Sequence, residues 1–80
     1  MNVLTEDQFK DKIKDILIVQ FSATWCGPCK ALARTIESCK EDLTHPIYQM
    51  DIDKNAKLCS ALSIRSVPTL IRFENGEEVK

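Results

Sequence analysis

The apolar residues along the chain predict three central β-strands. Residues 16–21 are almost all apolar and rich in β-branched side chains. This pattern is typical of a strand that is covered on both faces of its sheet. Residues 47–52 are again mostly apolar, and residues 69–73 form a third segment of the same kind. Two short strands are expected besides these, one within residues 1–4 and one beginning at residue 77.

A polar N-cap signature and apolar residues at helical spacing predict the first helix. Thr5 is followed by two acidic residues and by Gln8, which together are a signature of a helix start. Phe9 and Ile13 then mark an apolar face, because residues four apart lie on the same side of a helix. We expect the opposite face to be in water, since it carries lysine and aspartate residues.

Two further helices are predicted between the strands. The longer one begins at Pro28 and carries an apolar stripe with spacings of four, three and four residues. The stripe consists of Leu32, Ile36, Cys39 and Leu43. Residues 53–55 should cap the third helix, whose inner face is expected to carry Leu58, Ala61 and Leu62.

A length of 80 residues predicts one small domain, which spans residues 1–80. Asn75-Gly76 is typical of a tight hairpin turn, so the strand that begins at residue 77 should return beside residues 69–73. The sequence shows no repeat, linker or low-complexity segment.

Composition and charge exclude several classes of partner. Charged residues make up 29% of the chain, and the net charge is −1. A balance this close to neutral gives no electrostatic reason to expect nucleic acid or an anionic membrane as a partner. The first twenty residues contain many charges, so they predict neither a signal peptide nor a membrane span. We therefore expect a cytoplasmic protein, in which cysteines serve catalysis or metal binding more often than structural disulfides.

The candidate chemistry lies in residues 25–30, Trp-Cys-Gly-Pro-Cys-Lys. Pro28 cannot lie inside a helix, but it fits the first turn, where its missing N–H has no partner to lose. Cys26 is thereby placed at the start of the helix, where unpaired backbone N–H groups and the helix dipole favour a thiolate. We expect Cys26 to have a lowered pKa and to act as the nucleophile. Cys29, one turn further along, is placed to attack the mixed disulfide that Cys26 forms.

Residues 25–30 match the active-site motif of the thioredoxin family, and the resemblance covers nearly the whole chain. Residues 16–23 resemble the family's central strand, which leads into the site. Residues 51–53 resemble the end of the next strand, and residues 64–69, which contain Val-Pro-Thr, resemble the loop with a cis-proline. Asn75-Gly76 resembles the last hairpin turn.

The resemblance implies a fold and a function. The implied fold is the thioredoxin fold, an α/β fold with a central mixed β-sheet flanked by helices, and we expect it to be truncated here at the C-terminal strand and helix. We therefore expect a thinly covered sheet face, and either a monomer or a weak dimer. The implied function is that of a protein-disulfide reductase, an electron carrier that needs no metal or organic cofactor because the Cys26–Cys29 disulfide is itself the redox centre. The implied partners are protein disulfide substrates and a thioredoxin reductase.

Several neighbouring residues are implied to support the two cysteines. The family pattern makes the Val67–Pro68 peptide bond cis, packs it against the cysteines and offers the Val67 backbone to a substrate. Trp25 should form an apolar rim for a docking partner, although a core role is the alternative. Lys30 either aids thiolate formation or is a solvated helix charge. Gly27 and Pro28 complete the supporting set between the cysteines.

The chain departs from the family pattern at three positions. Gln20 stands where most thioredoxins have a buried aspartate that moves the proton of the second thiol, and glutamine cannot take up that proton. We therefore expect a slower resolving step. Gln49 replaces a lysine that often lies near the aspartate, so both charges are absent together. Arg34 stands where the family commonly has a helix-kinking proline, which predicts a straighter helix.

Other interpretations of the cysteines remain. Cys26 and Cys29 could be half of a zinc site completed by Cys39 and Cys59, but those two are predicted on opposite faces of the sheet and far from the pair. We interpret them as buried structural thiols. The short chain also allows a glutaredoxin-like enzyme that takes electrons from glutathione. The third interpretation is a non-catalytic thioredoxin-like subunit that docks on a larger enzyme.

Overall fold

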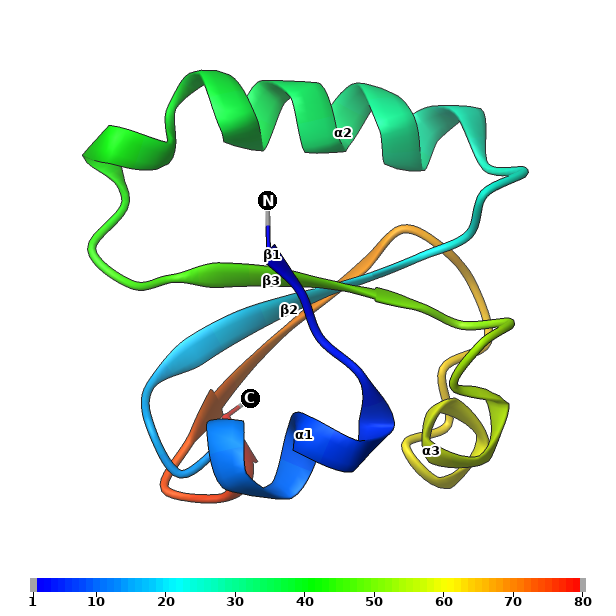
Figure 1. Cartoon of the computed structure of the whole chain (residues 1–80). Coiled ribbons are helices and arrows are strands. Elements are labelled where there is room, and N and C mark those ends of the chain that lie inside the picture. Colours follow the sequence, from blue (N-terminus) through cyan, green and yellow to red (C-terminus); the bar gives the residue numbers. More distant parts are fainter. Residues whose placement is uncertain (1, 80) are drawn as a thin grey trace.

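The computed structural model describes residues 2–79, which form a five-stranded mixed sheet with helices on both faces (Figure 1). The strand order is β1-β3-β2-β4-β5. β1, β3 and β2 run parallel, whereas β4 is antiparallel to β2 and β5 is antiparallel to β4. The strands are β1 (Asn2–Val3), β2 (Leu17–Ser22), β3 (Ile47–Asp51), β4 (Thr69–Glu74) and β5 (Glu77–Val79). The predicted α/β class and mixed sheet are confirmed.

The helices divide between the two faces of the sheet. In Figure 1, α2 covers one face, while α1 and α3 lie on the other. This arrangement follows from the connections, because the parallel strands β1, β2 and β3 are joined by helices that must cross over the sheet. The helices are α1 (Glu6–Lys12), α2 (Gly27–Ser38) and α3 (Ala56–Ala61), with a 3₁₀ turn, η1 (Lys40–Asp42), after α2.

The hydrophobic core lies on the α1 and α3 side of the sheet. Alternate residues of β2 point to this side because side chains alternate along a strand, and all three are buried. The rings of Phe9 from α1 and Phe73 from β4 meet edge to face, with centroids 5.1 Å apart. The buried residues of this core are Leu4, Phe9, Ile13, Leu17, Val19, Phe21, Met50, Cys59 and Phe73.

The face beneath α2 is more polar and more open. Gln20 and Ser22 of β2 point to this side and are buried. Gln20 pairs in register with Gln49 of β3 and with Leu70 of β4. Leu70 is 49% exposed, and Val79 of β5, opposite Arg72, is also exposed. The thin cover that the sequence predicted for this side of the sheet is therefore present over β4 and β5.

The start of α1 is fixed by contacts near and far in the sequence. The Thr5 N–H donates to the side-chain oxygen of Gln8 at 3.3 Å, as the helix-start signature predicted. The Glu6 N–H donates to Oδ1 of Asn55 at 2.9 Å. Asn55 is the N-cap of α3 and is buried, so one side chain joins the starts of two helices.

Two details of the predicted helices were wrong. The apolar stripe of α2 was extended to Leu43, but the helix ends at Ser38 and Leu43 is exposed. The chain leaves helical geometry at Cys39, whose φ is −119°, and continues as η1. In α3, Ala61 is exposed, and Cys59 supplies the buried inner contact instead. Among residues 2–79, no helix is long and apolar enough to cross a membrane.

Candidate active site

Cys26 and Cys29 are joined by a disulfide bond at the N-terminus of α2. Their Cα atoms are 5.3 Å apart, within the range that a disulfide requires. Cys26 is the N-cap residue with extended backbone geometry, and Pro28 occupies the first turn, as the sequence predicted. The fold thus brings together the two sulfur atoms on which the expected chemistry depends.

The two sulfur atoms differ in their surroundings. The Cys29 backbone N–H donates to Sγ of Cys26 at 3.1 Å, so a free N–H group of the first helical turn is aimed at that sulfur. Cys26 is 5% exposed and Cys29 is 1% exposed. An incoming group therefore reaches Cys26 more easily, and Cys29 is covered by protein.

A small apolar cluster surrounds the disulfide. Ala23, Cys26 and Cys29 form its buried part, and Ile52 and Val67 pack against them. Val67 belongs to the loop before β4, and its peptide bond to Pro68 is cis. The loop and the start of α2 therefore meet at the reactive sulfurs, although about forty residues of sequence separate them.

Trp25 lies outside this cluster. Its side chain is 67% exposed, and its indole N–H donates to Oδ2 of Asp53 at 2.9 Å. Asp53 is fixed in turn, because its backbone N–H donates to Oδ1 of Asp51 at 2.8 Å. The aromatic ring beside Cys26 is thereby anchored through its polar edge and leaves its apolar surface open to solvent.

Gln20 lies beneath the second cysteine. It is 0% exposed, and its side-chain Nε2 donates to the backbone oxygen of Cys29 at 3.3 Å. Within the described part of the chain, its Oε1 has no hydrogen-bond partner. Gln49, its neighbour on β3, donates from Nε2 to Oγ of Ser22 at 3.0 Å. The two glutamines therefore keep separate partners and do not form a pair.

The thioredoxin family model matches residues 1–80, the full length of this chain. The chain belongs to the thioredoxin family. It is 37% identical to a thioredoxin of Chlamydia trachomatis over 82 residues, covering 100% of this chain and 80% of that protein. A thioredoxin of Rickettsia prowazekii is also 37% identical, with 98% of this chain and 79% of that protein covered.

Solved thioredoxin structures share the fold. The crystal structure of the Malassezia sympodialis thioredoxin Mala s 13 superposes with a TM-score of 0.86 at 30% identity, covering 99% of this chain and 76% of that one. A mutant thioredoxin from Halobacterium salinarum also gives a TM-score of 0.86, at 34% identity, and covers 100% of this chain and 73% of that one. The protein is thus a thiol–disulfide oxidoreductase that reduces protein disulfides through its own cysteine pair.

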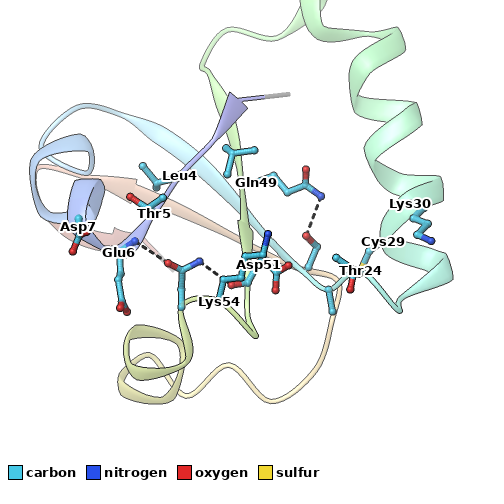
Figure 2. Close-up of a pocket in the computed structure, with 14 residues that line it drawn as sticks. Leu4, Thr5, Glu6, Asp7, Thr24, Cys29, Lys30, Gln49, Asp51 and Lys54 are labelled. Carbon is cyan, nitrogen blue, oxygen red and sulfur yellow. Dashed lines mark hydrogen bonds between the residues drawn. The ribbon is translucent and has the colours of Figure 1, made fainter.

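A pocket of about 730 Å³ reaches this thioredoxin site from the side of β1. It lies where the parallel strands end, which is the edge at which α/β proteins commonly form clefts. In Figure 2, Gln49 and Lys30 line opposite sides of the pocket, on the sheet and on α2. Cys29 is also part of its wall. Lys30 is exposed there and forms no ion pair within residues 2–79.

The other two cysteines lie away from the pair. Cys59 is buried in the core on the opposite side of the sheet, as predicted, whereas Cys39, which was also predicted to be buried, is only half-buried at the far end of α2. Burial raises the pKa of the Cys59 thiol, and the carboxylates of Glu6 and Asp51 reinforce the shift. A thiol of this kind is a poor nucleophile. No cluster of three His, Cys, Asp or Glu side chains within residues 2–79 could hold a metal ion.

Sequence reasoning missed two contributors to the site. Asp53 was interpreted only as part of a helix cap, yet it anchors Trp25 across 28 positions of sequence. Ile52, just beyond β3, packs against the cysteine cluster and was assigned only to a strand. The apolar Ile52 between two aspartates is visible in the sequence, but no local pattern shows which loop its side chain contacts.

Proposed function

We propose that Cys26 attacks the substrate disulfide and that Cys29 resolves the mixed disulfide. The Cys26 thiolate displaces one substrate sulfur and forms a disulfide with the other. The Cys29 thiol then loses its proton and attacks Sγ of Cys26, which restores the Cys26–Cys29 bond. Two electrons pass to the substrate, and its two sulfur atoms leave as thiols.

The hydrogen bond from the Cys29 N–H to Sγ of Cys26 carries this assignment. A backbone donor and the positive end of α2 both favour negative charge on Cys26. Cys29 has only 1% of its surface exposed, so a bulky substrate has little access to it. Because Cys29 lies one turn along α2 from Cys26, it is well placed for the intramolecular attack on Sγ of Cys26.

The surface around Cys26 fits an extended protein segment. Gly27 and Pro28 are exposed, and Gly27 adds no side chain that could block the approach to the sulfur. Trp25 supplies an apolar surface on one side, and Val67 and Pro68, both partly buried, supply another. We assign substrate binding to these three residues, with the backbone of Val67 as the hydrogen-bonding edge.

Lys30 and Gln20 complete the proposed machinery. The exposed Lys30 adds positive charge to the first turn of α2, and Gln20 holds the Cys29 backbone. Because glutamine does not ionise, the Cys29 proton leaves without the help of a carboxylate. We therefore expect the resolving step to be slower than in family members that have the aspartate.

The electrons would come from a thioredoxin reductase, as in the family, and go to protein disulfides in the cytoplasm. The free thiols of Cys39 and Cys59 suit a reducing compartment. The pair needs no organic cofactor, since the disulfide itself accepts the electrons. We expect a single domain that works as a monomer or a weak dimer.

The assignment is tested by insulin reduction with dithiothreitol as the electron source. Cys26→Ser should abolish turnover, because serine cannot form the mixed disulfide. Once the dithiothreitol has been removed, prereduced Cys29→Ser should accumulate a mixed disulfide with insulin, which nonreducing electrophoresis detects. Cys39→Ser is the matched control and should keep wild-type activity, since Cys39 lies at the far end of α2. Full activity in Cys26→Ser would contradict the proposal.

A further inference from the structure

Gln20 carries an unusual atom. Among the residues that the structure describes, its Oε1 is the one buried side-chain oxygen or nitrogen without a hydrogen-bond partner. An unpaired acceptor in the protein interior destabilises the fold and calls for an explanation. The Gln20 side chain is also in a fixed orientation, because its Nε2 donates to the Cys29 backbone oxygen. Exchanging the amide oxygen and nitrogen would place two acceptors against each other.

The unpaired oxygen is held beside the residue that gains a proton on reduction. Oε1 shares a carbon atom with the Nε2 that contacts Cys29, so the amide keeps it next to that residue. In the disulfide form, neither sulfur carries a hydrogen atom. In the reduced form, Cys29 gains a thiol S–H, a weak donor that is 1% exposed and needs a partner within the protein.

We propose that Gln20 is a redox-coupled positioning residue, whose Oε1 accepts a hydrogen bond from the Cys29 thiol only in the reduced protein. An external dithiol supplies two electrons and is oxidised to a disulfide. The Cys26–Cys29 bond breaks, Cys26 becomes a thiolate and Cys29 takes one proton. The second proton of the dithiol goes to solvent. The unpaired donor and the unpaired acceptor then satisfy each other.

This arrangement favours the reduced form. The Nε2 bond to the Cys29 backbone is present in both redox states, so its loss would affect both alike. The Oε1 bond exists in one state only, so its loss changes the equilibrium between them. The proposal rests on the proposed function in taking Cys26 and Cys29 as the redox pair, and it adds a residue that sets the reduction potential of that pair.

The acceptor is removed by Gln20→Met, which keeps the length of the side chain. The equilibrium constant for reduction is measured in glutathione redox buffers. We expect the variant disulfide to be about fivefold harder to reduce, which corresponds to a potential about 20 mV more negative. Gln49→Met, in the matched position on β3, should leave the equilibrium constant unchanged. An unchanged value in Gln20→Met would overturn the proposal.

The variant Ser22→Ala tests whether a second acceptor near Cys29, the Ser22 hydroxyl, takes the hydrogen bond of the thiol instead of Gln20. Ser22 and Cys29 both line the pocket, so Oγ of Ser22 is the rival partner for the thiol. The proposal requires Ser22→Ala to change the equilibrium constant less than Gln20→Met does. A shift in Ser22→Ala with none in Gln20→Met would assign the acceptor to the pocket and overturn the proposal.

Unfolding by urea tests the same claim through stability. Gln20→Met should destabilise the reduced protein more than the oxidised protein, and the difference should match the shift in the equilibrium constant. Equal destabilisation of both forms would show a merely structural role and overturn the proposal. If the wild type failed to reduce insulin, the proposed function would fail, but these equilibrium measurements would still test Gln20.

The wild-type protein offers a test that needs no variant. The side-chain carbonyl carbon of Gln20 should change its NMR chemical shift on reduction with dithiothreitol, because its oxygen gains a hydrogen bond. The corresponding carbon of Gln49 is the internal control and should shift less. An unchanged Gln20 signal would overturn the proposal.

Discussion

Trp25 and Asp53 form a contact between single residues that shapes the edge of the site. The indole N–H and the carboxylate are both at the surface, so their hydrogen bond competes with water. Its main effect is on position, because it holds a large aromatic ring in one orientation beside Cys26. The loop before α2 is thereby connected to the loop before α3.

We predict that Asp53→Ala releases the Trp25 ring with little loss of stability. The free energy of unfolding should fall by less than about 1 kcal/mol, since the lost bond is exposed. The indole N–H should exchange faster with solvent and change its chemical shift, both of which NMR measures. Asp15→Ala, at another exposed aspartate, should leave the indole signal unchanged. An unchanged indole signal in Asp53→Ala would contradict the hydrogen bond between Trp25 and Asp53.

Residue patterns along the chain predicted the cysteine pair well and its distant contacts poorly. Residues 25–30 contain the cap, the proline and both thiols within one turn of helix, so local rules suffice. The Trp25–Asp53 bond depends on how two loops approach each other, which no local pattern encodes. The sequence likewise could not predict the unpaired Oε1 of Gln20, because whether a buried oxygen has a hydrogen-bond partner depends on the positions of all its neighbours.

At the scale of elements, α2 performs different tasks at its two ends. Its N-terminus holds the disulfide, and near its C-terminus Glu37 forms an ion pair with Lys40 of η1, with 2.7 Å between the two charged groups. The periodicity of apolar residues predicted the helix but placed its end too late. Periodicity reports which face a residue would occupy, whereas the end of a helix depends on local backbone geometry. Leu43 has the spacing of the apolar stripe but lies beyond the end of α2, so its side chain is exposed.

The Lys40 ammonium is the main cause that lowers the pKa of Glu37 from 4.5 to about 2. The carboxylate therefore stabilises the folded protein at pH values above its unfolded pKa, and this contribution is lost as the pH falls toward 2. We predict that Lys40→Met raises the pKa of Glu37 and reduces the loss of stability between pH 4.5 and 2. NMR titration of the Glu37 side chain measures the shift.

Lys30→Met is the control for this prediction, because it removes a cation from the other end of α2. It should leave the titration of Glu37 unchanged. Since the Glu37 side chain is exposed to solvent, the effect should also shrink as salt is added. A pKa of Glu37 that stayed near 2 in Lys40→Met would show that other groups hold it there.

At the scale of the whole molecule, stability and chemistry lie on opposite sides of the sheet. The α1 and α3 side holds the large apolar residues, and the α2 side holds the disulfide, Gln20 and Ser22. The pattern of apolar residues predicted the strands that form both sides. It predicted less about how much each side is buried, since that depends on which helix covers which strand.

We predict that Phe73→Ala costs about 3–5 kcal/mol of folding free energy, because it empties a closely packed site. In a chain of 80 residues, this is a large part of the total stability. Leu70→Ala, on the other face of the same strand, should cost less than about 1 kcal/mol. Urea denaturation measures both. Equal losses would show that the α2 side contributes as much to folding as the core does.

The separation of the core from the disulfide has a consequence for how such a protein can diverge. Amino-acid changes around the reactive sulfurs alter few of the contacts on which folding depends, so variants with new redox properties can survive without compensating changes elsewhere. Gln20 and Gln49 both lie on the α2 side and contribute hydrogen bonds there rather than apolar packing, which fits this freedom. Chemical innovation on one side of the sheet is tolerated because structural integrity is maintained on the other.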